Sequence, residues 1–131
     1  MATTIHDVET RRRISGGGLR TWFNIAADWQ LTDRQAARLL GAPISTYRRW
    51  KTKPDTTLDI GQIERLSLLL GIYKALQLLL PRVDAADDWI HRPNNSPLFG
   101  GQAPLARMLA GLTEDIALVR RHLDAERGGW A

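Results

Sequence analysis

The fold is decided by residues 33–50, which read DRQAARLLGAPISTYRRW. Gly41 separates two helical patterns in this stretch, and glycine readily adopts the positive φ that a tight turn between helices requires. Ala37 stands four residues before it and is small enough for two helices to cross closely. Tyr47 and Trp50 are three residues apart, so they share one helix face and are expected to enter the core against Trp22 or Leu40. The stretch predicts a helix-turn-helix whose second helix covers residues 45–51.

The outward face of that second helix is predicted to be basic. The chain carries a net charge of +4, and residues 34–53 contain six Lys or Arg residues and no acidic residue. Short polar side chains at the start of such a helix can reach base edges, and arginines can contact guanine or phosphate. The residues predicted to bind DNA are Arg34, Ile44, Ser45, Thr46, Arg48, Arg49, Lys51 and Lys53. A solvated Arg-rich face, or one that binds a protein, is the alternative interpretation.

Composition excludes several classes of protein. With 131 residues, 44% of them hydrophobic and 24% charged, the chain is typical of a globular domain rather than of a disordered protein. The absence of cysteine excludes disulfide scaffolds and Cys-ligated metal sites. His6, His91 and His122 are too far apart for a short metal motif, so we expect no metal and no cofactor. No segment has the pattern of a membrane span or a signal peptide, which favours the cytoplasm.

Apolar spacing outside residues 33–50 predicts only helices, so the chain is predicted to be all-α. A first helix starts near Leu19, and Thr32 with Gln35 forms a capping-box pattern before the second. A long helix begins after Asp59 and reaches Pro81, with a bend expected at Gly71. Further helices are predicted over residues 83–90, from residue 104, and from a cap at residue 113 to the glycines at 128–129.

This pattern divides the chain into three predicted segments. Residues 1–18 are polar, contain three consecutive arginines and end in three glycines, so they are predicted to form a flexible basic tail. Residues 19–80 form the predicted helix-turn-helix domain, and residues 81–131 form a small helical module. This last module contains no convergent set of polar side chains that would suggest catalysis, so the chain is not expected to be an enzyme.

The C-terminal module has a distinctive order of residues. Trp89 is followed by Pro93-Asn94, then Phe99-Gly100-Gly101, then Pro104-Leu105, and finally a helix that ends in Gly-Gly-Trp. This order resembles the toxin-binding domain of the Xre/MbcA/ParS antitoxin family. Together with the helix-turn-helix, the resemblance covers residues 19–131.

The resemblance implies an antitoxin of a type II toxin–antitoxin system. The expected partner is a RES-domain toxin that consumes NAD or uses it for ADP-ribosyl transfer, and the expected second partner is operator DNA, bound to repress the operon. The resemblance also implies a homodimer and a higher-order complex with the toxin. A helix-turn-helix regulator without a toxin is the alternative.

The toxin contacts are expected along the C-terminal module. Trp130 offers a flat aromatic ring that fits a nicotinamide or adenine pocket, and the two preceding glycines let the backbone pass close to another surface. The expected toxin-binding residues are Trp89, Asn94, Phe99, Gly100, Gly101, Arg120, Arg127, Gly128, Gly129, Trp130 and Ala131.

Overall fold

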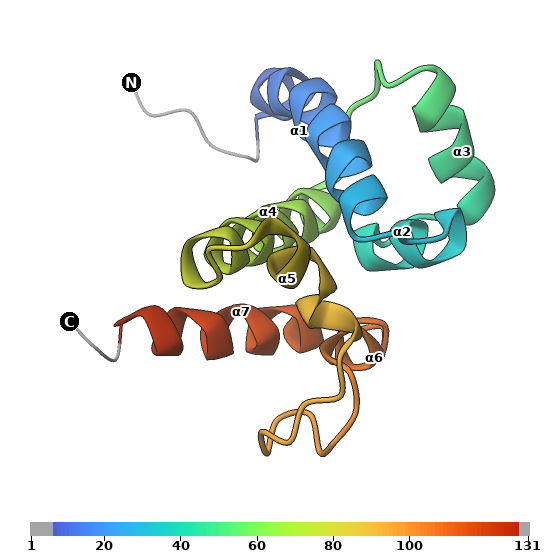
Figure 1. The fold of residues 1–131 in the computed structure, drawn as a ribbon. Coiled ribbons are helices and arrows are strands. Elements are labelled where there is room, and N and C mark those ends of the chain that lie inside the picture. Colours follow the sequence, from blue (N-terminus) through green and yellow to red (C-terminus); the bar gives the residue numbers. More distant parts are fainter. Residues whose placement is uncertain (1–6, 129–131) are drawn as a thin grey trace. The chain divides into compact units, whose positions relative to one another are not determined.

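The computed structural model describes residues 7–128, and within that range it contains helices and no strand, which confirms the all-α prediction (Figure 1). Two compact units divide between Ser67 and Leu68, inside one continuous helix, and each is described by itself. The helices are α1 (Val8–Asp28), α2 (Asp33–Leu40), α3 (Ile44–Thr52), α4 (Ile60–Leu79), α5 (Val83–Asp88), the short 3-10 helix η1 (Trp89–His91), α6 (Pro104–Met108) and α7 (Thr113–Gly128).

The helix-turn-helix forms as predicted. The Thr32 hydroxyl accepts a hydrogen bond from the Gln35 N–H at 3.1 Å, and the Gln35 side chain accepts one from the Thr32 N–H at 3.0 Å. This capping box starts α2, and Gly41 ends it in the left-handed region with φ of +76°. Ala37 is buried beside the turn, and α2 packs directly against α3 (Figure 1).

Aromatic side chains fill the core of the first unit. Trp22 and Trp29 are fully buried and meet edge to face with ring centroids 5.9 Å apart. Phe23 meets Tyr47 in the same way at 5.6 Å. Tyr47 and Trp50 are both buried, so the prediction that this pair anchors α3 in the core is confirmed.

The flexible tail predicted over residues 1–18 is wrong for residues 8–18, which form the first half of α1. Asp7 caps the helix by accepting a hydrogen bond from the Glu9 N–H at 2.8 Å. Ser15 is fully buried, and its hydroxyl donates to the Arg11 carbonyl and accepts from the Leu58 N–H at 2.9 Å. Gly18 also has a packing role, because a Cβ there would lie 2.6 Å from a Leu66 methyl carbon on α4. Tertiary contacts thus order a stretch that has weak helix propensity.

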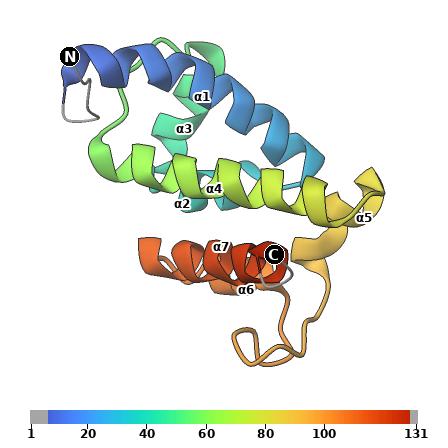
Figure 2. The same ribbon diagram turned by 90° about the vertical axis from the view of Figure 1, so that its left-hand side faces the viewer.

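The second unit contains the rest of α4 and the helices that follow it. Helix α6 packs against α7 (Figure 2). The buried side chains of this unit include Leu69, Ile72, Leu76, Ile90, Met108, Ile116, Val119 and Leu123. The helix predicted over residues 83–90 is present as α5 followed by η1.

One predicted detail of the second unit differs in the structure. Thr113 is the first residue of α7 and not its cap; the start is held by Asp115, which accepts from the Leu112 N–H at 3.2 Å and pairs with the Arg107 Nε at 3.1 Å. Helix α4 continues through Gly71, where the missing side chain makes room for Arg120. A Cβ at Gly71 would lie only 1.4 Å from an Arg120 guanidinium nitrogen, so close approach explains this glycine.

The Ser15 hydrogen bond gives a first test of the fold. Replacing Ser15 by Ala leaves the buried Leu58 N–H without its acceptor, and the expected loss of unfolding free energy is about 1–3 kcal/mol. Thr21→Ala is the matched control, because the Thr21 hydroxyl makes the same bond to the carbonyl four residues earlier, at 3.0 Å, on an exposed face. Urea denaturation of both variants measures the difference, and equal losses would contradict the role of Ser15.

Candidate DNA-binding and partner-binding surfaces

Helix α3 presents most of the predicted DNA-binding residues to solvent. Because Tyr47 and Trp50 point into the core, the helical repeat turns Ser45 and Arg49 to the opposite side. The exposed members of the predicted set are Arg34, Ser45, Arg48, Arg49, Lys51 and Lys53. The other two, Ile44 and Thr46, are half-buried. The structure therefore brings these residues to one region of the first unit, and their contact with DNA stays a prediction.

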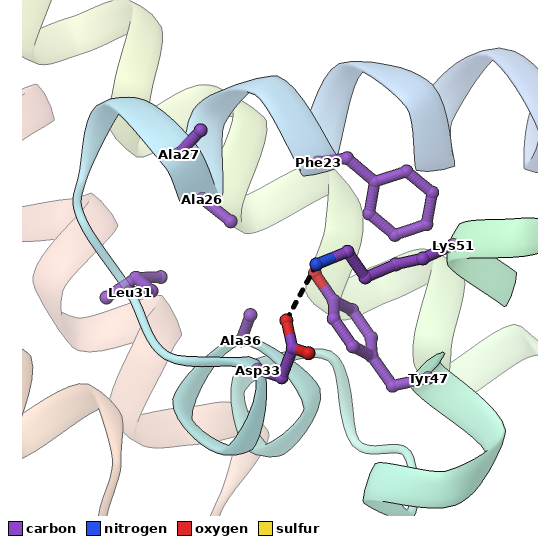
Figure 3. A pocket seen from close by; sticks show the side chains of 8 residues that line it. All are labelled: Phe23, Ala26, Ala27, Leu31, Asp33, Ala36, Tyr47 and Lys51. Atoms are coloured by element: carbon purple, nitrogen blue, oxygen red, sulfur yellow. Dashed lines mark hydrogen bonds and ion pairs between the residues drawn. The ribbon is translucent and has the colours of Figure 1, made fainter. Parts of the chain in front are cut away.

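An acidic residue of the preceding helix lies beside this surface, although residues 34–53 themselves contain none. Asp33, the first residue of α2, binds the Lys51 ammonium at 2.8 Å (Figure 3). Its carboxylate also lies 3.5 Å from the Arg48 Nε. The hydrogen bond from Lys51 is the main cause that lowers the pKa of Asp33 below its ordinary value; partial burial opposes it and the nearby Arg48 adds to it. Sequence reasoning missed this contact because Asp33 precedes Lys51 by 18 residues, and only the turn between the two helices brings them together.

A pocket of about 190 Å³ lies next to the ion pair, between α1, α2 and α3 (Figure 3). Its walls are Phe23, Ala26, Ala27, Leu31, Asp33, Ala36, Tyr47 and Lys51. Burial, reinforced by the negative charge of Asp33, raises the pKa of Tyr47 far above its ordinary value, so this side chain stays a neutral phenol. The side chain of Lys51 lines the pocket, which means that it is turned toward the helix bundle rather than away from it.

In the second unit, three rings form an aromatic cluster. The half-buried Trp89 meets Phe99 edge to face at 5.8 Å and stacks on His122 at 6.3 Å, while Phe99 and His122 are 5.3 Å apart. Phe99 is 5% exposed and supports the other two rings from the core, whereas Trp89 keeps some accessible surface. Glu126 lies 3.2 Å from the His122 Nε2. His122 was not among the predicted toxin-binding residues, because nothing in the sequence shows that α7 passes beside Trp89.

The loop between η1 and α6 is closed by hydrogen bonds. The Asn94 N–H donates to the Gln102 carbonyl at 3.0 Å, and the Gly101 N–H donates to the Asn94 carbonyl at 2.9 Å. The Asn94 side chain accepts from the Ser96 N–H at 2.9 Å. Gly100 and Gly101 have φ values of +57° and +89° and are exposed, so the backbone at the loop tip is accessible to a partner.

The remaining predicted toxin-binding residues lie on α7 or beyond it. The Arg120 Nε binds both carboxylate oxygens of Asp124 at 3.0–3.1 Å, and its guanidinium fills the space above Gly71. The contacts of this side chain are therefore made inside the second unit. Arg127 and Gly128 are exposed at the end of α7. Gly129, Trp130 and Ala131 lie outside the described residues.

The part of the chain that the structure describes contains neither a membrane-spanning helix nor a cluster of metal ligands. No helix between residues 7 and 128 is long and apolar enough to cross a membrane. Within the same range, no three His, Cys, Asp or Glu side chains stand close enough together to hold a metal ion.

Comparison with known proteins connects both units to one family. Residues 10–71 match the antitoxin Xre-like helix-turn-helix domain, and residues 75–129 match the antitoxin Xre/MbcA/ParS C-terminal toxin-binding domain. The chain belongs to the Xre/MbcA/ParS antitoxin family. A relative named "Uncharacterized protein y4oB", from Sinorhizobium fredii (strain NBRC 101917 / NGR234), is 46% identical over 112 residues, which cover 85% of this chain and 84% of the relative.

Family membership confirms the resemblance that the sequence shows. The protein is an antitoxin of a toxin–antitoxin system: it combines a helix-turn-helix domain with a toxin-binding domain, and its partner is a protein toxin. The domains of this family are not enzymatic. The helix-turn-helix match begins at residue 10, so it includes most of the helical segment that the sequence pattern assigned to a tail.

The ion pair of Asp33 predicts how stability depends on pH. Because the folded-state pKa of Asp33 is lowered, its contribution is present above pH of about 4 and is lost as the pH falls through the folded pKa. The partners are partly exposed, so Asp33→Asn is expected to reduce the unfolding free energy by at most about 1 kcal/mol at pH 7. Urea denaturation at pH 7 and pH 3 measures the difference in unfolding free energy between wild type and Asp33→Asn. This difference should shrink at pH 3, and a larger difference there would contradict the stabilising role of the Asp33 ion pair.

Proposed function

We propose that this antitoxin neutralises a RES-domain, NAD-consuming toxin by blocking its active site, and that it binds operator DNA through α3 to repress its own operon. The observation that carries this proposal is the match to a toxin-binding domain in the same chain as a helix-turn-helix with an exposed basic helix. A homodimer and a larger complex with the toxin are part of the same proposal.

The exposed side of α3 supports the DNA-binding part. Arg34, Arg49 and Lys53 are exposed and form no ion pair with any described residue, so their charges are available to phosphate groups. Ser45 stands in the first turn of α3, where a hydroxyl can bond to a base edge or a phosphate. Together these residues supply both kinds of contact that specific DNA binding uses.

Replacing Arg48 and Arg49 together by Ala tests the DNA interface. Affinity for the promoter of its own operon is expected to fall several-fold to hundred-fold, since a good contact contributes about 1–3 kcal/mol. The control is the Arg82→Ala, Arg92→Ala double variant, which removes the same charge from exposed positions of the second unit. Fluorescence anisotropy with a labelled promoter duplex gives both affinities. Unchanged binding by a folded Arg48/Arg49 variant would contradict the assignment of α3.

The toxin-binding part is supported by the surface of the second unit. Trp89 is held by Phe99 and His122, and the exposed loop tip at Gly100 and Gly101 allows close backbone approach. Large aromatic side chains dominate the energetics of protein interfaces. Within this proposal Trp130 enters the NAD site of the toxin, where its ring takes the place of nicotinamide or adenine.

The experiment is co-expression with the product of the adjacent gene, followed by co-purification and an assay of NAD consumption. Deletion of residues 128–131 is expected to leave the complex intact through the rest of the interface while inhibition drops measurably. Trp130→Phe is the matched control and should retain inhibition, because it keeps an aromatic ring. Full inhibition by the truncated chain would show that the tail does not block the site. Promoter binding with no captured toxin would favour a regulator without a toxin partner.

A further inference from the structure

The basic residues of α3 fall into two groups that differ in their partners. Arg48 and Lys51 lie on the side of α2, and both contact the carboxylate of Asp33, at 3.5 Å and 2.8 Å. Arg49 faces away from the core and forms no ion pair with any described residue. The positive charge of α3 is therefore unequally available to DNA: one group is partly neutralised and the other is not.

Asp33 is held firmly in its place. It follows Thr32, whose capping box with Gln35 fixes the first turn of α2. Its bond to Lys51 crosses from α2 to α3, and the Lys51 side chain lies along the wall of the pocket (Figure 3). The Asp33 side chain is nevertheless 33% exposed. A fixed negative charge thus lies at the edge of the surface that α3 offers to DNA.

We propose that Asp33 limits the electrostatic part of DNA binding: it draws Lys51 and part of the charge of Arg48 away from phosphate groups, so that the remaining contacts of α3 depend on Ser45 and Arg49. The inference rests on the proposed binding of DNA by α3. Binding to DNA of any sequence is driven by cations that displace counterions from phosphates, whereas base contacts distinguish one sequence from another. A carboxylate that neutralises cations weakens the contacts to phosphates and leaves the contacts to bases intact. Affinity for operator and for non-operator DNA is therefore lowered by a similar factor, and both affinities depend less steeply on salt.

Asp33→Asn tests this role, because the amide keeps the size of the side chain and removes the charge. Non-operator affinity is expected to rise several-fold at low salt, and the slope of log affinity against log salt should steepen by about one phosphate contact. Operator affinity should rise by a similar factor, because a contact to phosphate forms on DNA of any sequence. This direction is opposite to that of a structural defect, which would weaken binding to both DNAs.

The measurement is fluorescence anisotropy between 50 and 200 mM salt, roughly the range over which counterion release is large. One duplex comes from the promoter of its own operon, and the other is a shuffled duplex of the same length and composition. The control is Glu64→Gln, which removes the same charge from an exposed position on α4 that pairs with no described residue. Asp33→Glu, which keeps the charge, should retain the affinities and the salt slope of the wild type.

The outcomes are distinguishable. Tighter binding to both duplexes and a steeper salt slope in Asp33→Asn, with Glu64→Gln unchanged, would support the inference. Unchanged affinities and salt slope, an equal effect in Glu64→Gln, or weaker binding to both duplexes would overturn it while the wild type still binds its promoter. Absence of promoter binding by the wild type would instead overturn the proposed function, and this inference with it.

Discussion

Burial of Tyr47 and Trp50 is the constraint on which the first unit depends. The two rings are three residues apart on α3, and both are buried among the aromatic and aliphatic side chains of the first unit. A helix that buries two large rings on one side cannot rotate about its axis without emptying both sites. The rotation of α3 is fixed in this way, and with it the outward direction of Ser45 and Arg49. The chemistry of the outer face is thus a consequence of the packing of the inner one.

The parts of the fold that could be predicted from the sequence are those encoded locally. The capping box at Thr32, the positive φ of Gly41 and the inward pair on α3 all depend on residues within one or two turns of each other. The first half of α1 could not be predicted, because its order depends on the hydrogen bond between Ser15 and Leu58, which are 43 residues apart. A buried hydroxyl with two partners stabilises a segment that appears too polar to pack.

The same distinction applies to the candidate sites. Exposure of the basic residues on α3 followed from helical spacing alone. The partial neutralisation of Arg48 and Lys51 by Asp33 did not follow from helical spacing. The carboxylate belongs to the preceding helix and approaches α3 only because the chain turns at Gly41. A count of charges along a segment therefore overestimates the charge that the folded surface presents. What matters for a polyanionic partner is the number of cations left without a nearby acid.

In the second unit, contacts with two neighbouring rings order the side chain of Trp89. Trp89 is large and only half-buried, and a free indole at that position would lose rotational freedom on binding a partner. Phe99 and His122 restrict it from two directions, and the 28° angle between Trp89 and His122 is that of a stacked pair. Much of the ordering of this ring is thus completed on folding. Since side-chain ordering is one of the terms that weaken protein association, a ring that is already fixed in the free protein contributes more of its buried area to affinity.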